Sequence, residues 1–169
     1  MSNMNNAKIV VVVRAVFRFK DKYLLIEQMN ASGNDYLMFP GGHIKEGESL
    51  VDGLKREVSE ELNITDTKPV RIAFVKETLS PFDRNYEIFF ECKTEMSFEE
   101  VKILQREYTG YEKIKNCILA EEAELRGKSN FFPENFFSNT KYQYLELNLN
   151  QYISRFGEDR NIKKIKDES

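Results

Sequence analysis

The 169-residue sequence has no tryptophan, one histidine and two cysteines, and each shortage narrows the range of functions. His43 is the single histidine, so a catalytic triad is hard to build around it, and we interpret it as a residue of the surface or of a substrate rim. Cys92 and Cys117 form neither a metal-ligand spacing nor a disulfide framework, and we expect reduced structural thiols. Without tryptophan, aromatic contacts to a ligand must come from tyrosine or phenylalanine.

Long apolar runs and a surplus of basic residues are also missing. No window approaches 18 consecutive apolar residues, and residues 1–6 are polar with no basic region leading into an apolar segment. We therefore expect a cytoplasmic protein with no membrane partner. The net charge of −3 gives no broad basic surface, so a stable nucleic acid partner is not expected, although a small phosphorylated substrate could be held through a metal ion. A homodimer is left open.

The remaining composition is ordinary for a soluble globular protein. The chain is 41% hydrophobic and 31% charged, and its length is enough for one full hydrophobic core. We find no internal repeat and no long linker. We therefore predict a single domain over residues 1–169, with an ordered core over about 7–156 and a charged, frayed tail over 157–169.

β-Branched and aromatic residues predict several strands. Residues 8–19 contain a continuous apolar run that indicates a strand buried on both faces in part of its length. The other predicted strands span residues 23–28, 36–39, 70–77, 86–93 and 113–119. The first two strands form a hairpin, and turn residues at 80–83 indicate a second one. Arg14 interrupts the apolar run, so we expect it to reach solvent, to pair with a carboxylate or to contact a substrate phosphate.

The second half of the chain has weaker patterns. Residues 97–107 fit either a short helix or an irregular segment, residues 120–125 and 133–137 are predicted to start helices, and residues 142–156 fit either a strand or a helix. Four phenylalanines gather near the last of these helices: Phe131, Phe132, Phe136 and Phe137. Core packing is the first interpretation of this cluster, and stacking of one of its rings, or of Tyr36, on a nucleobase is the alternative.

A glycine turn followed by an acidic helix is the feature around which the chain is organised. Phe39 to Gly42 end a strand with a tight turn, where residues without side chains let backbone groups approach a metal or a phosphate closely. Ser49 is a suitable N-cap for a helix that runs to Leu62. At about 100° per residue, one stripe of this helix is apolar and three glutamates share the adjoining face. The stripe contains Val51, Leu54, Val58 and Leu62, and the acidic face contains Glu57, Glu60 and Glu61.

The three glutamates predict a cation site on a solvent-facing patch. Carboxylates at this spacing repel one another by roughly a few tenths of a kcal/mol per pair in a solvated helix, so a cation is expected beside them. Hard oxygen ligands suit Mg²⁺ or Mn²⁺, which bind through a few carboxylates plus substrate phosphates. A solvated acidic face without a ligand is the alternative interpretation.

Residues Gly42 to Ile64 resemble the Nudix box, G-x5-E-x7-R-E-U-x-E-E-x-G-U, in which U is aliphatic. The matching positions are Gly42, Glu48, Arg56, Glu57, Val58, Glu60, Glu61 and Ile64. Asn63 is the one departure, because the family has glycine there. This residue is expected to end the helix with positive φ, and asparagine is the next most tolerant residue, so we expect a small stability cost and no loss of chemistry. The Tyr36–Gly41 lead-in also resembles the family.

The resemblance implies a Nudix hydrolase of the α/β class, an α/β/α sandwich around a mixed β-sheet. It further implies that Mg²⁺, or Mn²⁺, is held by Glu57, Glu60, Glu61 and the Gly41 carbonyl. Glu60 would accept a proton in the reaction, and Arg56 would hold the acidic cluster in position by ion pairing. These two residues and Glu57 are the predicted catalytic residues.

Further candidate site residues follow partly from the residue types and partly from the same resemblance. Arg14, Tyr36 and Gly42 are the predicted substrate contacts, and Arg14 stands where related sequences often have an arginine. Glu112 is a candidate base or additional metal ligand, because a carboxylate near this point has that role in the family. Glu48 is expected to fix the loop before the helix and to reach the metal through water.

The implied reaction is cleavage of a phosphoanhydride bond in a nucleoside diphosphate linked to another moiety, such as a nucleoside triphosphate or a nucleotide sugar. The partner would be a nucleotide-type small molecule. A non-catalytic nucleotide-sensing module is the alternative, which the presence of all the box carboxylates disfavours. Diphosphate isomerisation is formally open because Cys92 and Cys117 are present. A P-loop is excluded, since no Gly-Lys-Ser/Thr follows the glycines, and substrate selectivity lies in loops outside the box.

Overall fold

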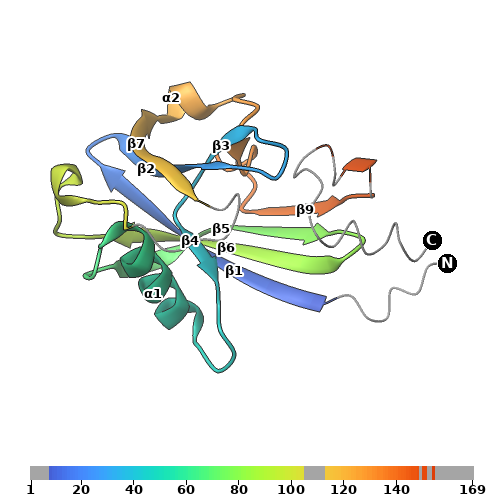
Figure 1. Ribbon diagram of the computed structural model, residues 1–169, viewed down its shortest axis with the longest axis horizontal. Coiled ribbons are helices and arrows are strands. Elements are labelled where there is room, and N and C mark those ends of the chain that lie inside the picture. The colour runs from blue at the N-terminus through green and yellow to red at the C-terminus, as the bar shows by residue number, and fades with distance from the viewer. Residues whose placement is uncertain (1–7, 105–112, 149, 152–153, 155–169) are drawn as a thin grey trace.

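A computed structural model describes residues 8–104, 113–148, 150, 151 and 154 of the chain (Figure 1). In chain order, these residues form β1 (Lys8–Phe19), β2 (Lys22–Met29), β3 (Asp35–Met38), β4 (Gly41–His43), α1 (Leu50–Leu62), β5 (Lys68–Leu79), β6 (Asp83–Lys93), a 3₁₀ helix (Phe98–Glu100), β7 (Ile114–Glu121), α2 (Glu122–Leu125), β8 (Phe131–Phe132) and β9 (Tyr142–Glu146). In this part of the chain, no helix is long and apolar enough to cross a membrane.

The strands form one mixed sheet in which β1 pairs with β2, β4 and β6. The order is β8-β3-β2-β1-β6-β5-β9, with β4 paired to β1 and β7 paired to β2. Most of β1 runs parallel to β6, whereas its last residues pair antiparallel with β2. Helices α1 and α2 lie on opposite sides of the strands (Figure 1). The predicted α/β class, with helices on both sides of a mixed sheet, is confirmed.

The side chains of β1 alternate between two hydrophobic clusters. Val13, Ala15 and Phe17 pack with the buried stripe of α1, whereas Val16 packs with a second cluster rich in phenylalanine. A strand covered on both faces has a nearly continuous apolar sequence, as the 8–19 segment has. The prediction that this strand is buried on both faces in part of its length is therefore confirmed.

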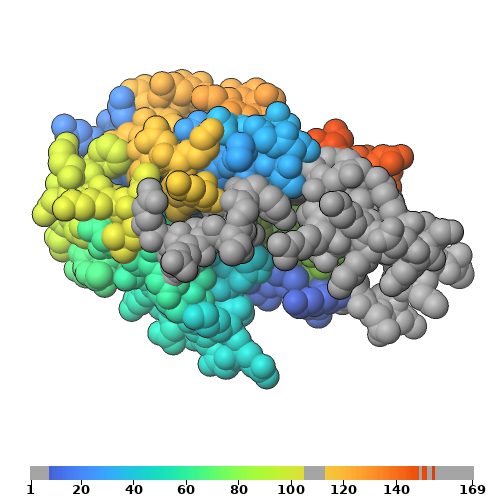
Figure 2. Space-filling view, viewed as in Figure 1, coloured from blue at the N-terminus to red at the C-terminus, as the bar shows by residue number. Residues whose placement is uncertain are grey.

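Three of the four residues predicted for the apolar stripe of α1 face the core. Leu54, Val58 and Leu62 are fully buried, but Val51 is 37% exposed, and its assignment to the core is wrong. Val51 lies in the first turn of α1, directly after the β4–α1 loop. This loop projects from the lower edge of the molecule (Figures 1 and 2), and in the first turn Leu50, rather than Val51, packs against the core.

The remaining strand predictions agree with the structure, and the predicted second hairpin is formed by β5 and β6. Residues 142–156, which fitted either type of element, begin as strand β9, and the described residues 150, 151 and 154 are helical. The helix predicted over 120–125 begins only at Glu122, because Ala120 and Glu121 still pair with β2.

Residues 97–104 follow the irregular alternative, and the helix start predicted at 133–137 is wrong. The segment for which a helix and an irregular structure were both open has a 3₁₀ turn that ends at Glu100, and residues 101–104 are not helical. The Lys102 and Leu104 backbone N–H groups bond instead to Asn63 and Glu61 at the end of α1. Residues 105–107 lie outside the described part. Residues 133–137 form consecutive turns with bonds from residue i+3 to residue i, and do not continue into a helix.

Candidate active site

Strand β4 brings two glycines against β1 and α1. Gly41 has φ +139°, and a Cβ atom at this position would lie 2.0 Å from the Val13 carbonyl oxygen. A Cβ atom on Gly42 would lie 2.7 Å from the Glu57 carboxylate. Glycine is therefore required at both positions, because a side chain would collide with the backbone of β1 or with the carboxylate of α1.

Helix α1 begins and ends at the residues that the sequence indicated. Ser49 is the N-cap, and its hydroxyl accepts a hydrogen bond of 3.1 Å from the Asp52 backbone N–H. Asn63 follows the last helical residue with φ +51°, in the left-handed region. Its predicted role as a helix cap with positive φ is confirmed.

Arg56 is the centre of an ion-pair network on α1. Its Nε and Nη2 atoms donate to the two carboxylate oxygens of Glu48, at 2.7 and 2.9 Å. Its Nη1 atom donates to Glu57 at 2.6 Å and to Glu60 at 3.1 Å. Nη2 also donates to the His43 carbonyl at 3.0 Å. The ion pair expected between Arg56 and Glu60 is present, and the same guanidinium joins the loop before the helix to the acidic face.

Glu48 fixes the loop between β4 and α1, as expected. Besides its two bonds from Arg56, its carboxylate accepts a hydrogen bond of 2.8 Å from the Lys45 backbone N–H. The Arg56 side chain and the Lys45 N–H together lower the pKa of Glu48 to about 2. Glu48 is therefore ionised at neutral pH and holds the guanidinium in one orientation.

The acidic face is less exposed than its sequence indicated. Glu57 and Glu61 are only 9% and 3% exposed, whereas the Glu60 side chain is 34% exposed. The prediction of a solvent-facing patch is therefore wrong for Glu57 and Glu61. The reason is that β4 lies across this face of the helix, where the Gly41 backbone N–H donates a hydrogen bond of 2.8 Å to Glu61.

Burial also changes the ionisation of Glu61. Removal from water raises the pKa of this carboxyl to about 8, although the Arg14 guanidinium and the Gly41 N–H oppose the rise. A carboxyl in this position is costly to ionise unless a further positive charge lies beside it. Glu61 is therefore suited to bind a cation.

The acidic face has the donor atoms of a magnesium or manganese site, but its carboxylates do not converge on one point. Glu57, Glu60, Glu61 and the Gly41 carbonyl all offer the oxygen atoms that these cations prefer. Within the described residues, however, no three acidic, histidine or cysteine side chains are grouped closely enough to hold one ion. The Arg56 guanidinium contacts both Glu57 and Glu60. The donor chemistry fits a divalent cation, whereas the predicted meeting of the three carboxylates is not present in this arrangement.

Arg14 pairs with a carboxylate, which is one of the three expectations for this residue. Its Nε and Nη2 atoms each lie 3.4 Å from a carboxylate oxygen of Glu87. Its Nη1 atom donates to the Gly41 carbonyl at 3.0 Å and to the Phe39 carbonyl at 3.5 Å. The guanidinium therefore touches the carbonyl that was predicted to bind the metal, next to the acidic face.

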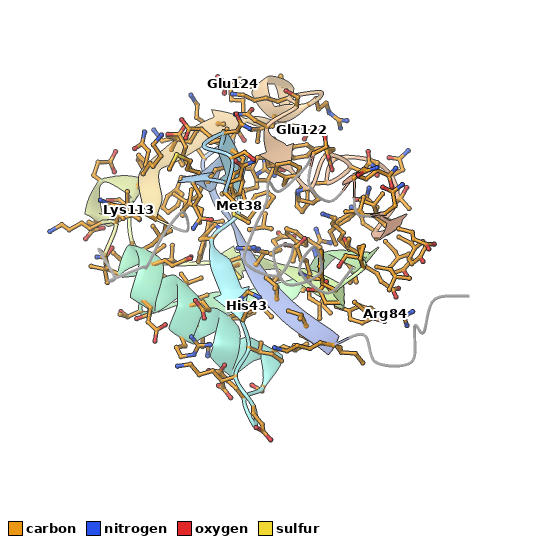
Figure 3. All side chains as sticks on the ribbon, turned by 45° about the vertical axis from the view of Figure 1, so that its right-hand side comes forward. Met38, His43, Arg84, Lys113, Glu122 and Glu124 are labelled. Atoms are coloured by element: carbon orange, nitrogen blue, oxygen red, sulfur yellow. The ribbon has the colours of Figure 1, made fainter. Side chains whose placement is uncertain are left out.

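The remaining predicted site residues are Tyr36, His43 and Glu112. The Tyr36 hydroxyl donates to Gln28 at 3.3 Å, and its ring meets Phe132 edge to face at 5.9 Å between centroids. His43 is exposed at the end of β4 (Figure 3), so its interpretation as a surface residue is confirmed. Glu112 lies outside the described residues.

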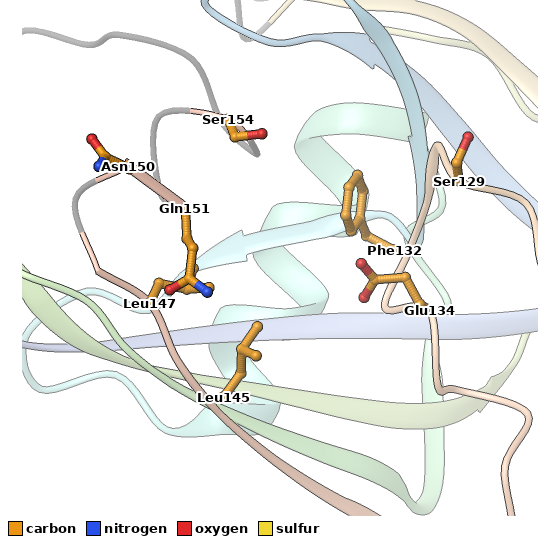
Figure 4. A pocket seen from close by; sticks show the side chains of 8 residues that line it. All are labelled: Ser129, Phe132, Glu134, Leu145, Leu147, Asn150, Gln151 and Ser154. Carbon is orange, nitrogen blue, oxygen red and sulfur yellow. The ribbon is translucent and has the colours of Figure 1, made fainter.

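The four phenylalanines separate into core and cavity positions, and Phe137 is half-buried against the second hydrophobic cluster. Phe131 and Phe136 are 0% and 9% exposed and belong to the second hydrophobic cluster, so core packing is confirmed for both. Phe132 is half-buried and lines a cavity of about 640 Å³, which we call the Phe132 cavity (Figure 4). Its other walls include Glu134, Leu145 and Leu147.

Sequence reasoning missed two charged residues of the central sheet. Lys76 of β5 and Glu87 of β6 are register partners, and both point to the face that carries the second hydrophobic cluster. The available signal was their spacing, because Lys76 and Glu87 each stand two positions from a buried phenylalanine of the same strand, Phe74 and Phe89. A charged residue at a core-facing position is a candidate for function.

Comparison with solved structures places this fold among known hydrolases. The chain is similar to a NUDIX hydrolase from Nitrosomonas europaea, with 25% identity, a TM-score of 0.56, and coverage of 70% of this chain and 76% of that chain. It is also similar to a MutT protein from Methanosarcina mazei Go1, with 25% identity, a TM-score of 0.63, and coverage of 78% and 92%. The E. coli ORF135 protein shares the fold at 18% identity, with a TM-score of 0.60 and coverage of 80% and 89%. A search of curated proteins finds no match.

A family model described as the NUDIX domain matches residues 7–135, which is most of the chain. The chain therefore belongs to the NUDIX family, and it is a Nudix hydrolase. Members of this family generally use divalent metal cations.

Proposed function

We propose that this Nudix hydrolase uses Mg²⁺, or Mn²⁺ in its place, to cleave a phosphoanhydride bond in a nucleoside diphosphate linked to another moiety. The observation that supports the proposal best is the contact between the acidic face of α1 and the glycine turn. There the Gly41 N–H meets Glu61, and Gly42 leaves room for the Glu57 carboxylate. Nucleoside triphosphates and nucleotide sugars are substrates of this kind.

The carboxylates of α1 and the glycine turn would hold the metal ion: Glu57, Glu60, Glu61 and the Gly41 carbonyl. When bound, the ion neutralises the diphosphate, polarises a phosphoryl oxygen and lowers the pKa of an attacking water. Glu60 is the most exposed of the three carboxylates, so we assign to it the acceptance of the proton from that water. Glu112 stays a candidate for the same role or for an additional ligand.

Arg56 and Arg14 have separate tasks in this proposal. Arg56 holds Glu57 and Glu60 in position through the bonds that its guanidinium donates. Arg14, which lies against the Gly41 carbonyl, is the proposed partner of a substrate phosphate, and Gly42 lets that phosphate approach the backbone.

The aromatic residues near the Phe132 cavity support a nucleotide-type substrate. Tyr36 packs on Phe132, which lines this cavity. Stacking of a base on an aromatic ring contributes roughly 1–3 kcal/mol by truncation in single-strand binders. This is enough to favour nucleotides over inorganic diphosphate by about tenfold or more.

A substrate panel tests the proposed function. Nucleoside triphosphates, nucleotide sugars, inorganic diphosphate, capped RNA and inositol polyphosphates are incubated with the enzyme and Mg²⁺, and the products are separated by chromatography. We expect release of a nucleoside monophosphate from at least one nucleotide, with slower turnover of the other compounds. Turnover of capped RNA or inositol polyphosphates well above every nucleotide would overturn the substrate class. Nucleotide binding without any hydrolysis would support the sensing module instead.

A further inference from the structure

The Glu87 carboxylate is shared by two cations, Lys76 and Arg14. Lys76 is 3% exposed, and its Nζ atom lies 3.4 Å from Glu87 Oε2. The other carboxylate oxygen, Oε1, lies 3.4 Å from Nε and from Nη2 of Arg14. Burial opposes the ionisation of Glu87, but Lys76 and Arg14 outweigh it and lower the pKa of Glu87 below its usual range.

The contacts of Lys76 leave its ammonium group incompletely satisfied. An ammonium has three N–H donors, and among the described residues its hydrogen bond and its ion pair are both with Glu87. At 3.4 Å, that contact is longer than the ordinary range of about 2.7–3.2 Å for a hydrogen bond between nitrogen and oxygen. A buried cation with spare donors is costly unless further acceptors reach it. Lys76 is therefore placed to bind an acceptor group of a ligand.

Two buried amide oxygens on the same face of the sheet lack a hydrogen-bond donor among the described residues. Gln143 of β9 is the register partner of Lys76, and Asn85 of β6 stands two positions before Glu87, so all four side chains share one face of the sheet. Among the described residues, Gln143 Oε1 and Asn85 Oδ1 are buried and have no hydrogen-bond partner. Buried amide oxygens nearly always have a partner, so these two are acceptors that a ligand can satisfy.

This group of side chains lies between the glycine turn and Leu145, which is one wall of the Phe132 cavity. At one end, Arg14 contacts the Gly41 carbonyl. At the other end, Leu145 stands two positions after Gln143 on the same face and lines the cavity, opposite Phe132 (Figure 4). The strands involved are β1, β6, β5 and β9 in that order, and three spacings of about 4.8 Å make the row about 14 Å long.

We propose that Lys76 and Gln143 recognise the nucleobase of the substrate, with Glu87 as the residue that positions Lys76. Lys76 donates to a carbonyl or ring nitrogen of the base, and the Gln143 amide oxygen accepts from a neighbouring N–H group. An edge with an acceptor beside a donor is present on nucleobases and absent from inorganic polyphosphates. This inference rests on the proposed function and extends it, because it assigns nucleotide selectivity to residues outside the acidic helix.

Equilibrium binding of reaction products tests this inference without requiring turnover. The probes are adenosine, guanosine, cytidine and uridine monophosphates, with inorganic diphosphate as the reference ligand, all measured by calorimetry. Wild-type protein is expected to bind at least one of the monophosphates. Lys76→Met and Gln143→Leu should each weaken that Kd by about tenfold or more, while the Kd of inorganic diphosphate changes by less than about twofold. Glu87→Gln should weaken the nucleotide Kd, and Glu87→Asp should recover part of the loss.

The matched control is Arg71→Met. Arg71 of β5 pairs with Glu91 of β6 at 2.7 Å in the same ladder, but it is exposed and lies away from the Phe132 cavity. This variant should bind every probe as wild type does. Gln143→Leu leaves the three charged side chains intact, so it keeps the test decisive if Lys76→Met fails to fold.

Three outcomes would overturn the inference. The first is wild-type protein that binds none of the four monophosphates. The second is an unchanged nucleotide Kd in folded Lys76→Met and Gln143→Leu. The third is an equal loss for nucleotide and inorganic diphosphate, which would make Lys76 a phosphate contact. Failure of the proposed function would appear separately, as an absence of hydrolysis in the substrate panel.

Discussion

The Lys102 backbone N–H donates a hydrogen bond of 2.6 Å to the Asn63 side-chain oxygen, which ties the segment after the 3₁₀ helix to the end of α1. The Asn63 amide also donates to the Glu100 carbonyl at 3.3 Å. A glycine at this position, as in the Nudix box, would accept the positive φ but would make neither bond. Asparagine therefore has a role of its own here, beyond tolerating the backbone conformation.

We predict that Asn63→Gly destabilises the protein by about 1 kcal/mol. Two hydrogen bonds of about 1 kcal/mol each are lost, and the easier positive φ of glycine offsets part of that loss. This replaces the expectation from sequence that the asparagine itself carries a small stability cost. Asn63→Asp, which keeps the oxygen acceptor for Lys102, should be intermediate, and Asn63→Val should be worst. Denaturant unfolding midpoints that place glycine at or above wild type would refute the role of the side chain.

The acidic helix and the sheet beside it show how far the structure could be predicted from the sequence. The register of α1, its caps and the Arg56–Glu60 pair follow from local spacing, so they could be predicted. The burial of Glu61 could not, because it depends on β4 crossing the helix. Lys76 and Glu87 are eleven residues apart and meet only through the pairing of β5 with β6. The spacing of each from a phenylalanine of its own strand indicates a core-facing position, but it does not predict that the two residues pair with each other.

Magnesium should stabilise the folded protein. A ligand that binds only the native state adds RT ln(1 + [L]/Kd) to the free energy of unfolding, about 2.7 kcal/mol at a hundredfold excess over Kd. We predict that Mg²⁺ raises the Tm of wild type more than that of Glu57→Gln. Glu99→Gln, on the exposed 3₁₀ helix, is the control and should respond as wild type does. Equal shifts in all three proteins would indicate a nonspecific salt effect.

The two cysteines should be unreactive in the native protein. Burial raises the pKa of the Cys92 thiol and of the Cys117 thiol to about 12. The thiolate is the nucleophile, so neither cysteine is suited to the catalysis that diphosphate isomerisation would need. We predict slow reaction of both thiols with a disulfide reagent at pH 8 and full reaction after denaturation. Rapid modification of either native thiol would contradict this and reopen the isomerase alternative.

Asp66 gives a pH dependence that is independent of the acidic helix. Its carboxylate accepts bonds from the Thr94 hydroxyl and the Glu95 N–H, which lower the pKa of Asp66. A pKa lowered by folding contributes stability above the unfolded value of about 3.9, and this stability is lost as the pH falls through the folded value. Asp66→Asn should therefore be less stable than wild type at pH 7, and the difference should shrink below pH 4. Urea unfolding at both pH values measures it, and a constant difference would argue against the linkage.

The most direct test of the acidic face is the initial rate of nucleoside monophosphate release from the best nucleotide of the substrate panel. The rate is measured for wild type, Glu60→Gln and Glu99→Gln in Mg²⁺, and for wild type in excess EDTA. We predict a loss of about 100-fold or more in Glu60→Gln and in EDTA, with Glu99→Gln equal to wild type. A folded Glu60→Gln enzyme at the wild-type rate, or full activity in EDTA, would contradict a metal site on α1.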